Sequence, residues 1–397
     1  MKSQASRRRV SAQKPYLTFG APDIGKEEIG AVTSVLRSSW LGTGPKTHDF
    51  EHLVGKYTGA QAACALNSAT AALHLSLVGL GIGAGDEVIT TPLTFCASAN
   101  AIIHAGATPV FVDVERDSMN IDPTKIEKAI TKKTKAILPV HMAGRPCNME
   151  AIKKLARKHK LFVIEDAAHA LGASYKGKKI GSLSDATCFS FYVTKNIITG
   201  EGGMITTNDK QFADRVRILS LHGMSKDAWK RYSASGYSHY EVVVPGFKYN
   251  LTDLASAIGI EQMKKISRFN ARRKKIWDIY SKAFKDLPVV LPAPIPADIE
   301  HARHLYTLLI DEKTTGLSRD AFMQALHERG VGSGVHFRPV HLHAYYREHF
   351  GYKEGDFPHA EYIGERTVSI PFSSALTDRE VSRVIKAVRE VIEEHHG

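Results

Sequence analysis

The sequence predicts an α/β protein, in which a mostly parallel sheet lies between two layers of helices and a smaller α+β domain follows. Four short apolar runs, at residues 86–90, 109–114, 135–140 and 161–166, have the length of buried strands. Helical patterns such as "CASANAIIHAG", "DPTKIEKAI" and "NMEAIKKLARKH" separate them. This alternation favours right-handed βαβ units, and therefore a parallel sheet with helices on both faces.

The C-terminal part repeats the alternation after a long helix expected over 254–284 and the proline-rich stretch "LPVVLPAPIPADIE". We expect a strand in "HLYTLLI", a helix in "SRDAFMQALHERG" and another strand in "VGSGVHF". The last helix should begin at Thr377 and Glu380, which have the spacing of a capping box. These features divide the chain into a basic tail at 1–15, expected to be disordered, a large domain at 16–270 and a small domain at 271–397.

The overall composition is that of a soluble globular protein, with 43% hydrophobic and 24% charged residues in 397. No apolar run approaches the roughly 18–20 residues of a membrane span, and the N-terminus lacks the apolar core of a secretory signal. The four cysteines are far apart and form no C-x-x-C pair. This usage is typical of free thiols in a reducing compartment, so we expect a cytoplasmic protein.

The net charge of +12 includes four charges from Lys2 and Arg7–Arg9 in the tail. No basic stretch is interleaved with aromatic residues and no nucleic-acid-binding motif is present, so the excess favours small phosphate-bearing anions over nucleic acid as ligands. The histidine-rich stretch at 336–350 offers His341 and His343 with one residue between them, which does not complete a set of metal ligands. We expect no metal site.

Two polar segments stand at predicted helix or strand ends, where open α/β sheets bind ligands. In "LNSATAALHLSL", Asn67 and Ser68 precede an apolar helix, so they either cap that helix or begin a phosphate site. In "VIEDAAHALG", Asp166 ends a strand and His169 follows three residues later. That carboxylate can hold a cationic ring nitrogen or cap the next turn.

A third segment, "CFSFYVTKNIITGEGG", places Lys195 between an apolar strand and a glycine-rich loop, five residues after Ser190. A lysine buried there loses its proton and becomes a reactive amine, whereas a snorkelling lysine keeps its head in water. A phosphate-binding helix start, an acid at a strand end and a lysine together match the needs of pyridoxal phosphate. This cofactor requires a lysine for its Schiff base, an acid at its pyridine nitrogen and a cup for its phosphate.

The chain resembles the DegT/StrS family of sugar aminotransferases, which are pyridoxal-phosphate enzymes of fold type I. The resemblance runs from "WLGTGPKTHDFE" to the last helix and is carried by "NSATAALHL", "TPLTFCASANAI", "IEDAAHALGASYKGKKIGSLSDATCFSFYVTKNI", "GEGGMITT", "PGFKYNLTDLASAIG" and "GVHFRPVHLHAYYRE". Within the family, "YNLTDL", "SRDAFMQALHERGVGSGVHFR" and "YYREHF" are most similar to enzymes that make UDP-4-amino-4-deoxy-L-arabinose.

The resemblance implies roles for the residues that match its motifs. Lys195 would form the Schiff base and move the proton during transfer, and Asp166 would keep the pyridine nitrogen protonated. His169 would lie near the phenolic oxygen of the cofactor, and Phe95 would stack on its ring. The phosphate would be held by the backbone of Ala69 and Thr70 with the Ser190 hydroxyl. Asn250 would reach the phosphate of a neighbouring subunit, which makes the enzyme a homodimer with shared active sites.

The implied reaction moves the amino group of L-glutamate to a nucleotide-linked keto-sugar, with pyridoxamine phosphate as the aminated form of the cofactor. The sugar-nucleotide side would be lined by Trp40, Leu41, Thr43, His336 and Phe337. Arg231 and Lys248 are expected to contact the anionic groups, unless they are solvated surface charges. Two alternatives remain open, a sugar dehydratase and a non-catalytic regulatory protein that binds the cofactor. Related dehydratases carry histidine in place of Lys195, which argues against the first.

Overall fold

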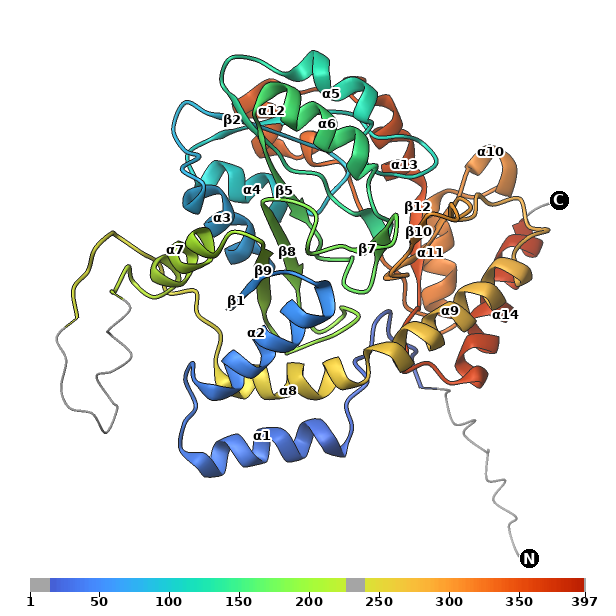
Figure 1. Cartoon of the computed structure of the whole chain (residues 1–397). Coiled ribbons are helices and arrows are strands. Elements are labelled where there is room, and N and C mark those ends of the chain that lie inside the picture. The colour runs from blue at the N-terminus through green and yellow to red at the C-terminus, as the bar shows by residue number, and fades with distance from the viewer. Residues whose placement is uncertain (1–14, 226–239, 396–397) are drawn as a thin grey trace, which may run out of the picture.

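The computed structural model describes residues 15–225 and 240–395, so most of the basic tail lies outside it. Its centre is a seven-stranded sheet in the order β1-β9-β8-β5-β4-β2-β3, parallel except for β9 (Figure 1). In that order the strands are Ala62–Leu66, Gly203–Thr207, Ala186–Ser190, Phe162–Asp166, Thr134–Ile137, Glu87–Thr90 and Thr108–Phe111. The predicted α/β fold with a mostly parallel sheet is confirmed, and each expected strand of the large domain is present in a slightly shorter or shifted form.

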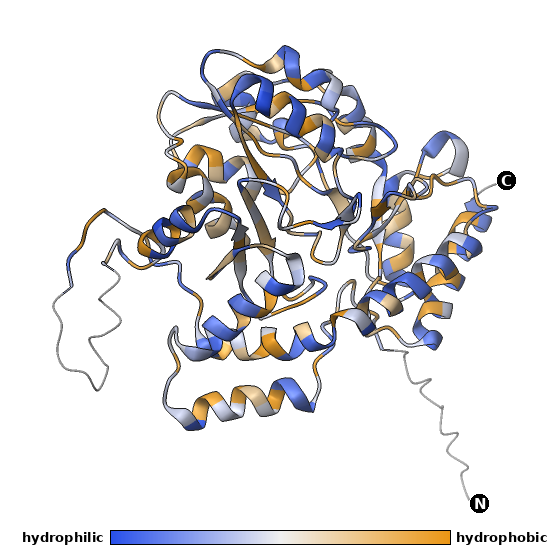
Figure 2. Cartoon of the chain, viewed as in Figure 1, coloured by the Kyte–Doolittle hydropathy of each residue, from blue (hydrophilic) through white to orange (hydrophobic). Residues whose placement is uncertain are grey.

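Helices cover both faces of this sheet, and the side-chain alternation of the strands shows why. On β1, Cys64 and Leu66 pack against one helical layer, whereas Ala63 and Ala65 pack against the other. The first layer consists of α3 (Ala69–Gly79), α4 (Ala97–His104) and α7 (Lys210–Ser220). The second consists of α2 (Pro45–Thr58), α5 (Pro123–Ala129), α6 (Met149–His159) and α8 (Asp253–Lys264). Figure 2 shows the strands between them as mostly hydrophobic.

The first helix, α1 (Lys26–Ser38), lies outside this arrangement and packs against α8. Its Glu28 is buried and accepts hydrogen bonds from Gln262 Nε2 at 2.8 Å and from Lys265 Nζ at 2.7 Å. A buried carboxylate needs such partners to offset the loss of hydration. These bonds therefore fix α1 to the end of α8.

The C-terminal part has a hydrophobic core of its own, built from residues 276–392 with Leu17. It contains the antiparallel pair β11 (Tyr306–Leu309) and β12 (Thr367–Ile370). Its helices are α9 (Ile266–Ala283), α10 (Glu312–Thr315), α11 (Arg319–Glu328), α12 (Ala344–Phe350), α13 (Pro358–Arg366) and α14 (Asp378–His395). A small sheet of β6 (Ser174–Tyr175), β7 (Lys178–Lys179) and β10 (Ile299–Glu300) connects the two parts. The predicted domain boundary at residue 271 falls inside helix α9 and coincides with no break in the chain. The boundary therefore stays a prediction.

Three local expectations can be compared with the structure. The capping box is confirmed, because Thr377 N–H donates to Glu380 Oε2 at 2.8 Å and Glu380 N–H donates to Thr377 Oγ1 at 3.2 Å. The helix expected at 254–284 is two helices, α8 and α9, separated at Lys265. The strand expected in "VGSGVHF" is wrong, since this segment makes only isolated bridges at Val331 and Gly334. Across the described residues, no helix is long and apolar enough to cross a membrane.

Candidate active site

A cavity of about 540 Å³ lies where the carboxyl ends of β5 and β8 meet the N-terminus of α3. Parallel α/β sheets bind their ligands at such an edge. Nine of the residues to which the family resemblance gives a role line this cavity: Ala69, Thr70, Phe95, Asp166, His169, Ser190, Lys195, His336 and Phe337. The fold therefore brings together groups that are up to 268 positions apart in the chain.

The N-terminus of α3 forms one end of the cavity. Ser68 caps the helix, because its Oγ accepts the N–H of Ala71 at 3.0 Å. The first N–H groups of an α-helix have no acceptor within the helix, and here these belong to Ala69 and Thr70. Gly203 of β9 allows this close packing, since a Cβ there would lie 2.2 Å from the Ser68 carbonyl oxygen. The capping role and the anion-binding role of this segment are thus compatible.

Asp166 ends β5 and is only 6% exposed. Its Oδ2 accepts the Ser98 hydroxyl at 2.7 Å and its Oδ1 accepts the N–H of Ala168 at 3.1 Å. Because Ser98 donates its proton to Asp166, Thr94 must donate to Ser98 across their 2.8 Å contact. Asp166 therefore caps the following turn and also faces the cavity, so the two readings of this residue do not exclude each other.

Lys195 follows β8 and lines the same cavity. Burial lowers the pKa of its ammonium to about 8, although the nearby Asp166 carboxylate opposes this shift. An amine with that pKa is partly neutral at physiological pH and can act as a nucleophile or base. The environment therefore favours the reactive reading of Lys195 over the snorkelling one.

Three histidines close the cavity and are neutral. Burial holds the pKa of His169 and of His304 well below the usual range, and the charge of Lys195 lowers both further. Burial and then Lys195 lower the pKa of His336 to about 4. The Nδ1 atom of His169 is buried and has no hydrogen-bond partner. A buried polar atom without a partner needs an explanation, and a ligand bound in the cavity beside His169 would supply one.

The other predicted residues lie elsewhere. Asn250 Nδ2 donates to Thr43 Oγ1 at 2.6 Å, and Thr43 in turn donates to the Leu251 carbonyl at 2.5 Å. Trp40 and Leu41 in the same loop are exposed. This cluster does not line the cavity of its own chain. Lys248 is exposed, and Arg231 lies outside the described residues.

Sequence reasoning missed four polar residues around the cavity: Ser98, His141, Asn196 and His304. His141 accepts the N–H of Cys147 at Nδ1 (3.0 Å), so its Nε2 must donate to the buried Glu165 at 2.8 Å. Two of these residues stand in polar stretches of the sequence, Asn196 in "KN" and His304 in "HARH". Nothing in either stretch, however, indicates that the two meet in the fold.

Two further cavities differ in character. One of about 660 Å³ shares Thr94, Phe95 and Phe337 with the first and adds Arg338 and Tyr345, among other residues. Another, of about 540 Å³, lies between α2, β1 and α7.

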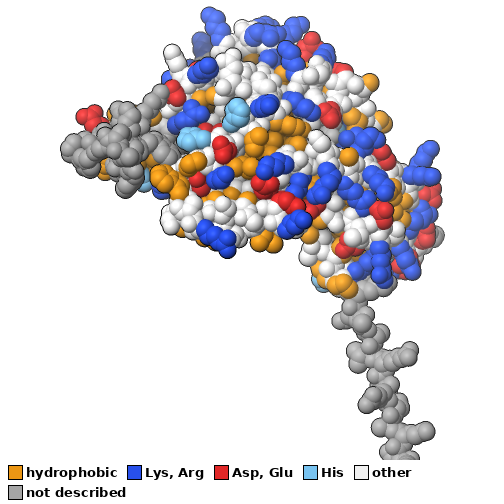
Figure 3. Space-filling model, turned by 60° about the horizontal axis from the view of Figure 1, so that its bottom comes forward, with side chains coloured by type: hydrophobic (Ala, Val, Ile, Leu, Met, Phe, Trp, Pro, Cys, Tyr) orange, Lys and Arg blue, Asp and Glu red, His pale blue; other side chains and the backbone are white. Residues whose placement is uncertain are grey.

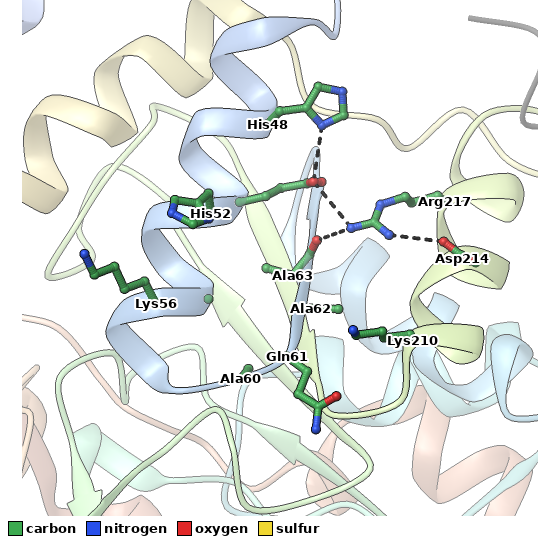
Figure 4. A pocket seen from close by; sticks show the side chains of 12 residues that line it. His48, His52, Lys56, Ala60, Gln61, Ala62, Ala63, Lys210, Asp214 and Arg217 are labelled. Carbon is green, nitrogen blue, oxygen red and sulfur yellow. Dashed lines mark hydrogen bonds and ion pairs between the residues drawn. The ribbon is translucent and has the colours of Figure 1, made fainter.

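Figure 4 shows the cavity between α2, β1 and α7. Its polar groups form hydrogen bonds with the backbone of β1, the edge strand of the sheet. Arg217 donates to the Ala63 carbonyl at 2.8 Å, and Glu51 accepts the Ala65 N–H at 2.8 Å. Arg217 and Glu51 also approach each other at 3.6 Å. Because these groups cover an unpaired strand edge, we assign this cavity a structural role.

Comparison with known proteins decides which family these features belong to. The model of the DegT/DnrJ/EryC1/StrS aminotransferase family matches residues 22–389. The chain belongs to this aminotransferase family. It is 51% identical to the uncharacterized protein MJ1066 of Methanocaldococcus jannaschii, over 96% of this chain and 99% of that one. It is 50% identical to the spore coat polysaccharide biosynthesis protein SpsC of Bacillus subtilis, with the same coverage. The putative sugar aminotransferase Spr1654 of Streptococcus pneumoniae has a similar structure, with a TM-score of 0.90, 36% identity and coverage of 95% and 99%.

Family membership confirms that this aminotransferase depends on pyridoxal phosphate, and Spr1654 has been solved in both PLP and PMP forms. The cavity fits this cofactor on its own features. It provides a partly neutral lysine, an ionisable acid at a strand end, a capped helix start with hydroxyls nearby and the unpaired Nδ1 of His169. These are the groups that hold the aldehyde, the ring nitrogen, the phosphate and the phenolic oxygen in such sites.

Proposed function

We propose that this aminotransferase transfers the amino group of L-glutamate to a nucleotide-linked 4-keto-sugar in the cytoplasm. The observation that carries the proposal is the meeting of Lys195, Asp166 and the start of α3 in one cavity. The adjoining cavity, with Arg338 and the exposed ring of Tyr345, offers a guanidinium for a diphosphate and an aromatic surface for a base. The 50% identity to a polysaccharide biosynthesis protein supports a sugar as acceptor.

The residues of the cavity would divide the work. Pyridoxal phosphate supplies a ring that accepts electrons when a proton leaves the carbon next to nitrogen. Asp166, held by Ser98 and Ala168, would keep the ring nitrogen protonated. Lys195 Nζ would take the proton from the α-carbon of the amino donor and return it on the product side. His169 Nδ1 would pair with the phenolic oxygen, and Phe95 would cover the ring.

The phosphate would bind the N–H groups of Ala69 and Thr70 and the Ser190 hydroxyl. His336 and Phe337 would form the sugar-nucleotide side of the same cavity. They would be joined by Trp40, Leu41 and Thr43.

We further propose a homodimer in which Asn250 reaches the site of the neighbouring subunit. The cluster of Asn250 with Thr43 lies outside the cavity of its own chain, which a shared site would explain. The same part of the molecule exposes Ile29 and Leu36 on α1 and then Trp40 and Leu41. Figure 3 shows hydrophobic side chains gathered on the face that carries α1 and α2. Exposed apolar groups of this kind mark interaction surfaces.

The reaction is tested by following the visible band of the bound cofactor. L-glutamate alone should convert the band to that of the aminated form, and a UDP- or dTDP-4-keto-sugar should restore it. Steady-state kinetics should be ping-pong, with parallel lines when glutamate is varied at fixed sugar concentrations. If only a free keto acid restores the band, the enzyme is an amino-acid aminotransferase.

The shared site is tested by mixing two inactive proteins, Lys195→Ala and Asn250→Ala. If the sites are shared between subunits, mixed dimers contain some sites in which both groups are intact, and activity should return. Sedimentation velocity at micromolar protein concentration measures the oligomeric state. A monomer there, or a mixture that stays inactive after subunit exchange, contradicts the shared site.

A further inference from the structure

The segment of residues 302–304, just before β11, is fixed beside the active site by backbone hydrogen bonds. Ala302 N–H donates to the Gly144 carbonyl, and His304 N–H donates to the Ala143 carbonyl, both at 2.9 Å. The fully buried Arg273 donates to the His304 carbonyl at 3.2 Å. Because β11 belongs to the C-terminal core and residues 143–144 belong to the large domain, these bonds hold His304 rigidly where the two parts meet.

Hydrogen bonds define the tautomer of His304. Asn196 Nδ2 donates to the Ala302 carbonyl at 2.8 Å, which turns its Oδ1 toward His304 Nδ1 at 3.0 Å. His304 Nδ1 must therefore carry the proton. Asn196 directly follows Lys195 and is itself buried. The side chain of His304 thus anchors the chain next to the reactive lysine.

The ring of His304 also lies close to the ring of His169, in a tilted arrangement. Its centroid lies 4.3 Å from that of His169, with the planes 34° apart. The next ring, that of Phe337, is 6.1 Å from His169. Since His169 Nδ1 has no hydrogen-bond partner in the protein, packing against these rings orients His169. Burial and the charges of Lys195 and Arg273 keep the pKa of His304 low, so this contact joins two neutral rings.

We propose that His304 is a positioning residue, which with Asn196 fixes both the ring of His169 and the backbone at Lys195. The inference rests on the roles proposed above for His169 and Lys195. It assigns His304 no contact with a reacting atom. Its effect is to hold two groups that must be placed within a fraction of an ångström for transfer to be fast.

Two substitutions separate the two contacts. His304→Asn keeps an N–H close to the position of Nδ1 but removes the ring, whereas His304→Phe keeps a ring but leaves Asn196 Oδ1 without its donor. His341→Phe is the matched control. His341 is also a buried histidine with one side-chain partner, Glu361 at 2.9 Å, and it does not line the cavity.

The measurements are the visible spectrum of the holoenzyme at fixed pH, the single-turnover rate with L-glutamate and the melting temperature. We expect both His304 variants to change the spectrum and to lower the single-turnover rate on the order of tenfold to a hundredfold. His341→Phe should lower the melting temperature but leave spectrum and rate unchanged. Wild-type spectrum and rate in both His304 variants would overturn the inference.

A double-mutant cycle tests the route through His169. If His304→Asn acts by releasing His169, it should cost little further rate in a His169→Ala background. Full additivity of the two effects would overturn this route. Failure of the proposed function looks different and shows in the wild-type protein itself. Borohydride would fix no cofactor on Lys195 if the role of that lysine is wrong, and no nucleotide keto-sugar would restore the cofactor band if the sugar is wrong.

Discussion

Replacing Lys195 by Met should stabilise the cofactor-free protein at neutral pH. The fold lowers the pKa of the Lys195 ammonium from 10.5 to about 8, chiefly through burial. A group whose pKa is lower in the folded than in the unfolded state costs stability when it is charged. The cost is therefore complete below pH 8 and disappears as the pH rises through 10.5. Methionine has a similar length and carries no charge, so it removes this cost.

The size of the effect follows from the two pKa values. A shift of 2.5 units, from 10.5 to 8, corresponds to about 3.4 kcal/mol at about 1.36 kcal/mol per unit. Linkage gives a cost of about 3.3 kcal/mol at pH 7, about 2 kcal/mol at pH 9 and about 0.8 kcal/mol at pH 10. Partial exposure of the side chain makes these values upper bounds.

Urea unfolding of both cofactor-free proteins at one protomer concentration measures the difference. The stability gain of Lys195→Met should be largest near pH 7 and should shrink by about 1 kcal/mol per pH unit between pH 8 and pH 10. Titrating groups far from Lys195 are the same in both proteins and cancel in the difference. A gain that does not depend on pH, or a variant less stable than the wild type at pH 7, would refute the reasoning.

Three other substitutions test the remaining parts of the site. Asp166→Asn should keep the fold, as measured by circular dichroism, but raise the barrier of the half-reaction by several kcal/mol. Near-normal turnover would mean that Asp166 only caps the following turn. Ser98→Ala removes one hydrogen bond to that carboxylate and should lower the single-turnover rate by about tenfold, corresponding to about 1.5 kcal/mol. Gly203→Ala places a Cβ 2.2 Å from the Ser68 carbonyl and should raise the dissociation constant of pyridoxal phosphate in equilibrium dialysis.

The sequence predicted the parts of the fold and site that depend on local pattern. The strands before Asp166 and Lys195 are short apolar runs, so their ends could be located to within a few residues. The cap at Ser68 needed only the polar residue before an apolar helix. The break at Lys265 was missed because both sides of it are helical in pattern. At Lys265 the backbone leaves the regular helix, with φ −98° and ψ −3°, and its Nζ contacts Glu28, 237 positions away.

The supporting residues of the site could not be predicted for the same reason. Ser98 meets Asp166 across 68 positions, and Asn196 meets His304 across 108. Serine, asparagine and histidine are common at helix starts and in loops, so their local setting carries no sign of these partners. Only the folded backbone defines which of them face the cavity.

The charges of the cavity also explain how it can receive a phosphate. Among the described residues that line it, the charged side chains are those of Lys195, Asp166 and Glu201. Low pKa values leave His169, His304 and His336 neutral. Among the described residues, no arginine lines this cavity and could balance a phosphate there. In the proposed site the N–H groups and dipole of α3 and the Ser190 hydroxyl would bind the phosphate, and neutral donors hold a phosphate with less sensitivity to salt than an exposed ion pair.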